Sequence, residues 1–450
     1  MQNDTNKVLE QKREQQSDIT KSKPFKKIGR FLKIFGPGIV TGAADDDPSG
    51  IATYTQAGAQ FGLQMPWTML FTLPLMTAVQ EACMRIGAVT GKGLASIIRE
   101  HYSKNILYAV VLLVVCANTL NIGSDLGAMA ASTQLLFPAI PFWVLTVGFA
   151  FLMILLEIFV PYHNYIRILK WLAVTLFAYM ATAFLINVPW SEVIQATFTP
   201  HIVWQKEYLY IIVAIFGTTI SPYLFFWQTS NVVEDEIAEH RLSEHGGVPK
   251  ISKSYLKRLR TDNALGMFFS NFMAWFMIIV GAVVLNRAGV TNVNTAADAA
   301  RALEPLVNTF PNSGLLAKII FSVGIIGIGL QSIPVLAGSS AYAVAETFGW
   351  KEGLYHKFRQ SRNFYFVIIF GTLVGLIFNF IGFDPIKALV FTAVFNGIAA
   401  VPLIFLIARL SSRSDVLGEH KSGIASKMGL WTAFGVMAIF ALALLYSFIG

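Results

Sequence analysis

The sequence predicts an all-α polytopic membrane protein with about 11 transmembrane helices, and three observations lead to this prediction. Hydrophobic residues make up 55% of the 450 residues, whereas charged residues make up only 13%, about half the share found in soluble domains. Apolar runs of about 20 residues, the length that crosses the hydrocarbon core of a bilayer, recur along the whole chain. Lys and Arg are also distributed very unevenly between the segments that join these runs.

Each apolar run is taken as one span, and the residues before the first run form a basic tail. The spans are Phe35–Gly58, Gln64–Ala88, Asn105–Leu135, Ile140–Val160, Ile166–Val188, Tyr208–Ser230, Asn263–Leu285, Leu316–Glu346, Phe364–Phe383, Pro385–Leu410 and Lys427–Phe448. Residues 1–34 are polar and basic and contain no short apolar segment typical of a secretory signal. They are predicted to form a cytoplasmic tail, and 427–448 an additional eleventh helix.

The orientation follows from the basic residues. With the N-terminus in the cytoplasm, only five of the 34 Lys and Arg residues fall in outside segments; these are Lys206, Arg287, Arg301, Lys318 and Lys387. This asymmetry predicts a cytoplasmic N-terminus and an outside C-terminus in the plasma membrane. The net charge of +8 therefore reflects the topology of the chain in a lipid bilayer, its expected partner, and does not indicate binding to nucleic acid. The only cysteines, Cys83 and Cys116, lie inside spans, so neither a disulfide framework nor a thiolate metal site is expected.

Two spans are interrupted by helix-breaking residues. The first breaks at Asp47-Pro48-Ser49-Gly50 and the sixth within Phe216–Phe226, which contains Gly217 and Pro222. Proline removes a backbone donor, and glycine tolerates unwound dihedral angles. Because five spans separate the two, the breaks fall at matching places of two halves, 35–188 and 208–410. Paired broken helices of this kind indicate a transporter whose site lies near the middle of the membrane.

The first break carries three consecutive carboxylates, Asp45, Asp46 and Asp47, inside the stretch TGAADDDPSGIATY. Charge inside a membrane is costly and is retained for function. Unwound backbone exposes carbonyl oxygens, and a carboxylate beside them suits a hard cation. The alternative is that Asp47 only caps the following half-helix, since Asp before Pro commonly begins a helix. Asp45 and Asp46 point to different faces, so either of them can touch the ion.

Three segments resemble the Nramp family of divalent metal transporters. They are GPGIVTGAADDDPSG at the first break, RIGAVTGKGLASIIRE (Arg85–Glu100), and GIIGIGLQSIPVLAGSSAYAVAETFGW (Gly324–Trp350). The similarity extends from about Gly36 to Leu410. It implies an inverted-repeat, leucine-transporter-type fold, with a core of residues 35–410 in which spans one to five are mirrored by spans six to ten.

The resemblance implies metal ligands and also shows departures from the family pattern. Asp47 matches the metal-binding aspartate, and by position the coordinating carbonyls map to Ala44 and Thr218, with Thr219 able to add a hydroxyl. Gly50 replaces an asparagine ligand, and Ser221 replaces a methionine whose sulfur favours transition metals. A wider site without sulfur suits partly hydrated Mg²⁺. The pattern is therefore most similar to the Nramp-related magnesium transporters.

Polar residues elsewhere in the spans define the remaining expectations. Asn396, on the tenth span, either contacts the ion or its water or makes a helix–helix hydrogen bond. Tyr223 and Gln228 occupy the positions of two family histidines, and Asn121 and Ser124 those of an acidic pair. Since none of these titrates near neutral pH, transport is predicted to be uncoupled from protons. A divalent ion then gains about 4.6 kcal/mol per 100 mV of membrane potential.

Two acidic residues and two loops are assigned structural roles. Asp125, one residue from Ser124, is expected to be satisfied by a nearby partner. If the alignment of the third span with the family pattern is off by one residue, Asp125 instead takes over part of the proton route. Glu157 is likewise expected to be satisfied. The inside loop Asn231–Asp262 is expected to hold a surface helix and a membrane-surface segment, and NTAADAARALEPL in the outside loop an amphipathic helix.

These observations favour a transporter or facilitator of Mg²⁺ that also passes Mn²⁺, with the metal ion as substrate and no cofactor. The alternative is a proton-coupled Mn²⁺ or Fe²⁺ importer. A Na⁺-coupled amino acid symporter of the same fold is more remote, because the run Asp45–Asp47 would repel a substrate carboxylate. An enzyme is not expected, since the spans contain no Ser/His pair, no Glu-x-x-His and no His pair at helical spacing.

Overall fold

A computed structural model describes residues 47–160, 175–243, 247, 249–354, 356, 358–382 and 384–449. All regular structure in this part of the chain is helical. The helices are α4 (Pro48–Phe61), η1 (Gly62–Gln64), α5 (Trp67–Thr90), α6 (Leu94–His101), α7 (Lys104–Leu136), α8 (Phe142–Phe159), α10 (Phe177–Leu185), α11 (Trp190–Phe198), α12 (Lys206–Thr219), α13 (Pro222–Ala238), α14 (Lys253–Val280), η3 (Gly281–Asn286), α15 (Ala296–Arg301), α16 (Glu304–Val307), α17 (Ser313–Phe348), α18 (Arg362–Phe378), α19 (Pro385–Leu410), α20 (Ser414–Leu417), η4 (Gly418–His420) and α21 (Ile424–Tyr446).

Within the described ranges, seven helical segments are long and apolar enough to cross a membrane. They are Lys104–Leu136, Phe142–Phe159, Lys206–Ala238, Lys253–Asn286, Ser313–Phe348, Pro385–Leu410 and Ile424–Tyr446. The other four predicted spans correspond to α4, α5, α10 and α18. The first and fifth predicted spans continue into residues outside the described ranges, α18 has only 17 residues, and α5 carries buried Glu81 and Arg85.

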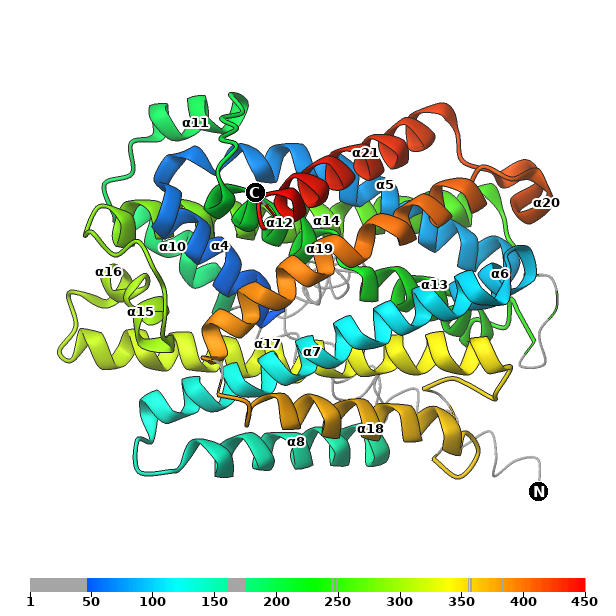
Figure 1. The fold of residues 1–450 in the computed structure, drawn as a ribbon, viewed down its shortest axis with the longest axis horizontal. Coiled ribbons are helices and arrows are strands. Elements are labelled where there is room, and N and C mark those ends of the chain that lie inside the picture. The colour runs from blue at the N-terminus through cyan, green and yellow to red at the C-terminus, as the bar shows by residue number, and fades with distance from the viewer. Residues whose placement is uncertain are drawn as a thin grey trace, which may run out of the picture.

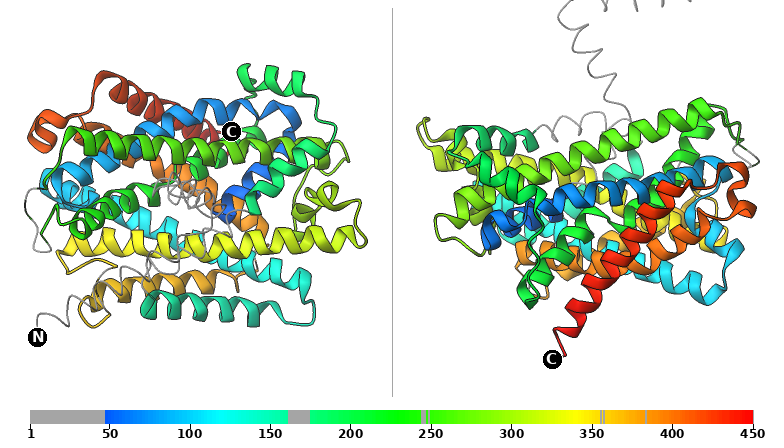
Figure 2. Two further views of the ribbon diagram at one scale, coloured as in Figure 1. Left: turned by 180° about the vertical axis from the view of Figure 1, so that it is seen from behind. Right: turned by 90° about the horizontal axis from the view of Figure 1, so that it is seen from above.

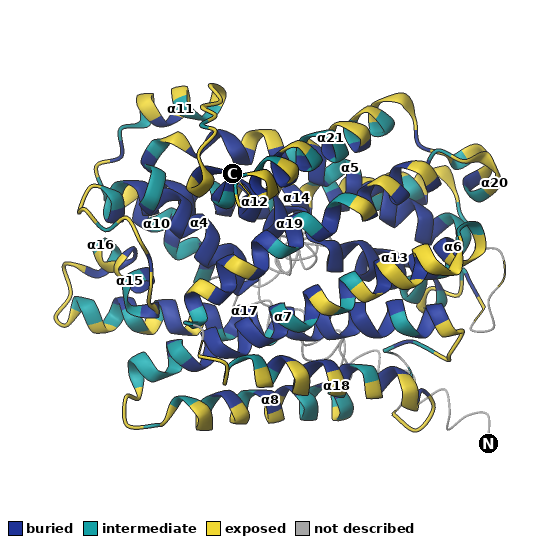
Figure 3. Ribbon diagram, viewed as in Figure 1, coloured by how far each residue is buried: buried dark blue, intermediate teal, exposed yellow. Residues whose placement is uncertain are grey.

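The two broken spans lie in the interior of the helix bundle (Figure 1). The long helices α7 and α17 pack along each other beneath them, and α8 and α18 flank that pair. On the opposite side, α5, α14 and α21 form a second layer, which the two further views also show (Figure 2). Between these layers α4 packs on α12, α14 and α19. Residues of α4, α12 and α13 are almost all buried, whereas α8 and α18 expose many side chains (Figure 3).

Glycines allow the broken helices to approach their neighbours closely. A Cβ placed on Gly217 of α12 would lie 1.9 Å from the Ala393 carbonyl oxygen of α19 and 2.3 Å from the Gly397 nitrogen. A Cβ on Gly58 of α4 would lie 2.1 Å from the Ile278 carbonyl oxygen. Only a residue without a side chain fits at these distances, so the two glycines fix the depth at which α4 and α12 sit in the bundle.

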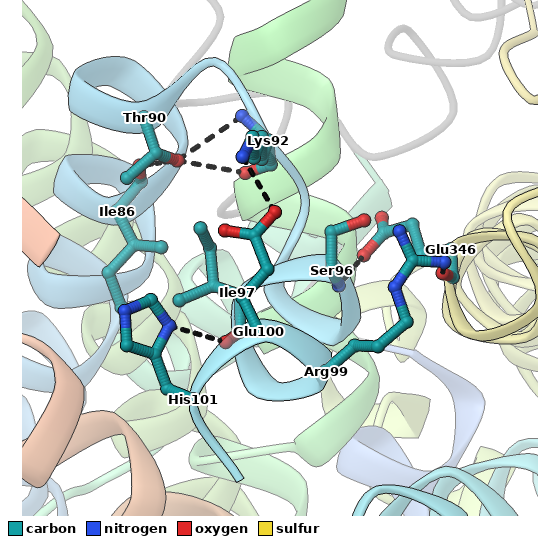
Figure 4. A network of polar contacts seen from close by, with 9 residues as sticks. All are labelled: Ile86, Thr90, Lys92, Ser96, Ile97, Arg99, Glu100, His101 and Glu346. Atoms are coloured by element: carbon teal, nitrogen blue, oxygen red, sulfur yellow. Dashed lines mark hydrogen bonds and ion pairs between the residues drawn. The ribbon is translucent and has the colours of Figure 1, made fainter. Parts of the chain in front are cut away.

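Two of the segments that resemble the family meet at one end of the bundle. Glu346 of α17 accepts a hydrogen bond from the Ser96 amide at 3.0 Å, and Arg99 donates to the Glu346 carbonyl at 2.6 Å (Figure 4). Glu346 also accepts from the Ser230 hydroxyl at 2.9 Å. A Cβ on Gly93 would overlap the Glu346 carboxylate. Gly93 in GKGLASIIRE therefore makes room for Glu346 in AVAETFGW. Through its hydrogen bonds, Glu346 joins α17 to α6 and α13.

The polar loops differ from the expectation in one respect. Among its described residues, the segment Asn231–Asp262 holds no separate surface helix: α13 continues to Ala238 and α14 already begins at Lys253. Its acidic and basic halves therefore include the ends of these two helices. The loop predicted to lie outside does contain short helices, α15 and α16, and Thr295 and Asp298 form a capping box at the start of α15.

Candidate metal-binding site

Asp47, where the sequence predicts the first break, is the residue immediately before α4. Asp47 has an extended backbone, with φ −71° and ψ 171°, and its side chain accepts the Gly50 amide at 2.9 Å. The same oxygen, Oδ1, accepts the Ser49 hydroxyl at 2.5 Å. Asp47 is 1% exposed, and its other oxygen, Oδ2, has no hydrogen-bond partner among the described residues. Asp47 therefore caps α4 with one oxygen and leaves the second available to a ligand.

The break in the sixth span is short and lies beside Asp47. Helix α12 ends at Thr219 and α13 begins at Pro222, so only Ile220 and Ser221 are outside helical geometry. The Thr218 hydroxyl lies 3.5 Å from Asp47 Oδ1 and 3.3 Å from the Ser49 hydroxyl. The fold therefore brings the two breaks together, although Asp47 and Thr218 are 171 residues apart in the sequence.

Ser221 fills the gap that Pro222 leaves in the helix. Because proline has no N–H, the carbonyl of Thr218 loses its usual helical donor. The Ser221 hydroxyl lies 2.8 Å from the Thr218 carbonyl oxygen and 2.8 Å from the Gly217 carbonyl oxygen. A hydroxyl carries one proton and two lone pairs, so it can donate to one carbonyl at a time. The lone pairs of Ser221 and one of the two carbonyl oxygens are therefore not used by this hydroxyl proton.

The other candidate ligands fall into three groups. Thr219 donates to the Ile215 carbonyl at 2.6 Å and lies 3.0 Å from the Tyr54 hydroxyl, so it ties α12 to α4. Gly50 faces the site, since a Cβ there would lie 3.3 Å from Thr218 Oγ1 and 3.8 Å from Asp47 Oδ1. Ala44 and Asp46, together with Asp45, lie outside the described residues.

Asn396 makes the helix–helix hydrogen bond that was its alternative role. Its Oδ1 accepts from the Asn121 Nδ2 at 2.9 Å, which joins α19 to α7. The remaining Nδ2 group of Asn396 is buried and finds no acceptor within the described ranges. In this orientation the Asn396 oxygen is used by Asn121, and the group left without a partner among the described residues is a donor, which cannot bind a cation. Ser124 similarly lies 3.3 Å from the Thr392 hydroxyl of α19.

Asp125 of α7, expected from the sequence to be satisfied by a partner or to take part of the proton route if the register differs by one, lies near the candidate site. It is fully buried, and its Oδ2 accepts the Ser332 hydroxyl at 2.8 Å. Its Oδ1 has no hydrogen-bond partner in the described part of the chain. Asp125 also lies close enough to Asp47 for the two carboxylates to repel each other when both are ionised. The signal that could have identified it is a lone acid in the middle of an apolar span.

The site therefore offers oxygen atoms to a ligand. Asp47 and Asp125 are buried carboxylates, each with one unpartnered oxygen among the described residues, and Asp47 lies beside the Thr218 hydroxyl of α12. No group of three or more His, Cys, Asp or Glu side chains gathers anywhere in the described ranges. Carboxylate, carbonyl and hydroxyl oxygens bind hard divalent cations, whereas soft metals favour sulfur.

Comparisons with known proteins agree with this architecture. The family model "Natural resistance-associated macrophage protein-like" (Nramp) matches residues 38–447. The Klebsiella pneumoniae protein named divalent metal cation transporter MntH is 25% identical over 405 residues, covering 86% of this chain and 89% of its own. The Pseudomonas aeruginosa divalent metal cation transporter MntH 1 is 24% identical over 434 residues, covering 95% of this chain and 93% of its own.

Solved structures share the fold. The Eremococcus coleocola manganese transporter, in complex with an aromatic bis-isothiourea substituted compound, superposes with a TM-score of 0.70 at 17% identity, covering 92% of this chain and 85% of the other. Mhp1, a nucleobase-cation-symport-1 family transporter, superposes with a TM-score of 0.54 at 15% identity, covering 92% of each chain. Since the family model spans nearly the entire chain, the protein belongs to the Nramp family of divalent metal transporters.

Proposed function

We propose that this protein carries divalent cations across the membrane and binds them at Asp47, between the broken helices α4 and α12–α13. One observation carries the proposal: a buried carboxylate at a helix break keeps one oxygen without a partner among the described residues. A helix cap alone needs neither full burial nor a second free oxygen. Thr218, Ser221 and the carbonyl groups beside them complete an oxygen-lined site.

The identity of the cation is supported by two different arguments. The related proteins are named for divalent metal cation and manganese transport, which favours Mn²⁺ over the Mg²⁺ expected from the sequence. The side chains at Asp47, Gly50 and Ser221 provide no sulfur, which favours a hard cation. Mn²⁺ and Mg²⁺ both accept oxygen ligands, so we propose Mn²⁺ as a substrate and Mg²⁺ as an effective competitor.

Uptake into proteoliposomes tests this proposal. Purified protein is reconstituted, an inside-negative potential is imposed, and uptake of Mn²⁺ is measured with increasing external Mg²⁺, Cd²⁺ or leucine. Competition by millimolar Mg²⁺ with little advantage for Cd²⁺ is the expected result. Complete exclusion of Mg²⁺ would show that the hard-ion argument is wrong, and uptake of leucine without metal would reassign the function to amino acid transport.

Restoring the family's ligand types should change metal preference. In the double variant Gly50→Asn/Ser221→Met, the thioether replaces a hydroxyl and an amide oxygen is placed beside Asp47, where a Cβ has contacts of 3.3–3.8 Å. We expect the preference for Cd²⁺ over Mg²⁺ to rise by at least about tenfold, about 1.4 kcal/mol. Competition uptake measures this ratio, and the single variant Ser221→Ala is the control that removes the hydroxyl without adding sulfur. An unchanged ratio in the double variant would exclude residue 221 from the coordination sphere.

Proton-coupled import of Mn²⁺ or Fe²⁺ is a second candidate, and Asp125 is the observation that favours it. The expectation of uncoupled transport depended on the absence of a titratable group beside the site. Asp125 is such a group, since it is buried near Asp47 with one oxygen lacking a partner among the described residues. Acids of this kind within membranes commonly relay protons.

Asp125→Asn separates coupled from uncoupled transport. If transport is coupled, liposomes loaded with a pH dye acidify in step with Mn²⁺ entry, and Asp125→Asn abolishes acidification. Glu157→Gln is a matched control, because Glu157 is also a buried acid within a span but lies on α8. Metal entry by the wild-type protein without acidification would support the uncoupled mechanism that the sequence predicts.

A further inference from the structure

The cytoplasmic start of α14 combines exposed basic side chains with a lipid-facing surface. Lys253, Lys257, Arg258 and Arg260, which we call the α14 basic surface, are all exposed. In the left view of Figure 2, α14 runs along the near side of the molecule with no other helix in front of it. The charge asymmetry predicted from the sequence places this end of α14 on the cytoplasmic side.

The basic surface is continuous with an apolar stripe along the same helix. Leu265, Phe268 and Phe272 are 46%, 49% and 37% exposed. Their spacing places them on one face, and that face continues back through Thr261 to Lys257. In a membrane-spanning helix, exposed apolar side chains face lipid chains. Lys257 precedes Leu265 by eight residues, about 12 Å along the helix axis, which places its ammonium group at the level of lipid headgroups.

Acidic residues offset only part of this charge. Glu239 accepts from Arg258 at 3.0 Å and from Arg241 at 2.6 Å. The hydrogen bond from Arg241, together with that from Arg258, lowers the pKa of Glu239, so its carboxylate stays ionised. Glu81 accepts from Arg260 at 3.1 Å. Lys253 and Lys257 have no ion-pair partner within the described ranges, and residues 250–261 contain no acidic residue.

We infer that the α14 basic surface binds the headgroup of an anionic phospholipid of the cytoplasmic leaflet, with Lys253 and Lys257 as the principal contacts. The phosphate of the headgroup supplies the negative charge that these lysines lack, and the acyl chains lie on Leu265, Phe268 and Phe272. A free phosphate ion would satisfy the lysines but would make no use of the apolar stripe. Basic clusters beside the cytoplasmic end of a membrane helix attract anionic lipid, and each charge contributes separately.

Lipid binding can be measured without transport, so this inference is tested independently of the metal site. Spin-labelled phosphatidylglycerol is titrated into the purified full-length protein in a neutral detergent, and phosphatidylglycerol, phosphatidylcholine and inorganic phosphate serve as competitors. We expect phosphatidylglycerol to compete, and phosphatidylcholine and phosphate to compete far more weakly. Equal competition by phosphatidylcholine would overturn the inference, and so would efficient competition by phosphate alone.

The lysines are tested by replacing both of them with neutral glutamine. Lys253→Gln/Lys257→Gln removes two charges that form no ion pair within the described ranges, and it should weaken phosphatidylglycerol binding by about five-fold per charge, about 25-fold for the pair. Arg287→Gln/Lys387→Gln is the matched control, since these exposed basic residues lie in segments assigned to the outside. Unchanged phosphatidylglycerol binding by the first pair, or an equal loss in the control pair, would overturn the assignment.

Discussion

Asp47→Asn is expected to lower divalent cation transport by at least about 100-fold while leaving the protein folded and inserted. Replacing residues behind the direct metal ligands costs 10–100-fold in other metal sites, so loss of the charged ligand itself should cost at least as much. Asn caps helices about as well as Asp, and it can still accept the Gly50 amide. The substitution therefore removes the cation ligand and retains the cap. Initial rates of Mn²⁺ uptake into proteoliposomes measure the effect.

The control for this variant is Asp415→Asn. Asp415 is exposed and lies on the short helix α20, where it pairs with Arg413, so its replacement should leave uptake unchanged. A monodisperse elution profile and an unchanged unfolding temperature would show that Asp47→Asn is folded. Wild-type uptake by a folded Asp47→Asn protein would reduce Asp47 to a helix cap and remove the main support for the proposed site.

Gly217→Ala is expected to destabilise the protein and to abolish transport. The added Cβ would lie 1.9 Å from the Ala393 carbonyl oxygen, so α12 must move away from α19. Overpacking of this kind costs roughly 1–3 kcal/mol, and the movement would shift Thr218, the next residue, relative to Asp47. The unfolding temperature in detergent and the rate of Mn²⁺ uptake report the two consequences.

Gly148→Ala provides a matched control within another membrane helix. Gly148 lies on α8, and a Cβ there would meet nothing within 4 Å. Alanine favours a helix over glycine by roughly 0.5–1 kcal/mol, so this variant should be as stable as the wild-type protein or more so. If Gly217→Ala behaved like Gly148→Ala in both measurements, the close contact between α12 and α19 would not determine the geometry of the site.

The breaks at Asp47 and Ser221 could be predicted from the sequence because their causes are local. Pro48 and Pro222 each remove a backbone donor, and each begins a new helix, α4 and α13. The family resemblance and the all-helical fold also followed from the sequence and agree with the family model and the solved structures. Helix ends were less accurate: α13 and α14 extend into the segment predicted to be a loop.

The position of Asp125 near Asp47 and the engagement of Ser221 both depend on tertiary structure, so the sequence indicated the first only as an alternative and did not indicate the second. Which face of α7 turns toward Asp47 is set by how α7 packs on α17 and α19, and a change of one residue in register moves a side chain by about 100°. The Ser221 hydroxyl reaches the carbonyl groups three and four residues before it, and the break between α12 and α13 is only two residues wide. The sequence alone was compatible with a longer unwound segment and therefore with a more open site.

Direct metal binding is the most decisive test of the site at Asp47. Free aqueous Mn²⁺ gives an electron paramagnetic resonance signal that is lost on binding, so titration of the purified protein counts sites without any transport assay. We expect one Mn²⁺ site in the wild-type protein that Mg²⁺ displaces, and no such site in Asp47→Asn. A folded Asp47→Asn protein that binds one Mn²⁺ with wild-type affinity would contradict the account.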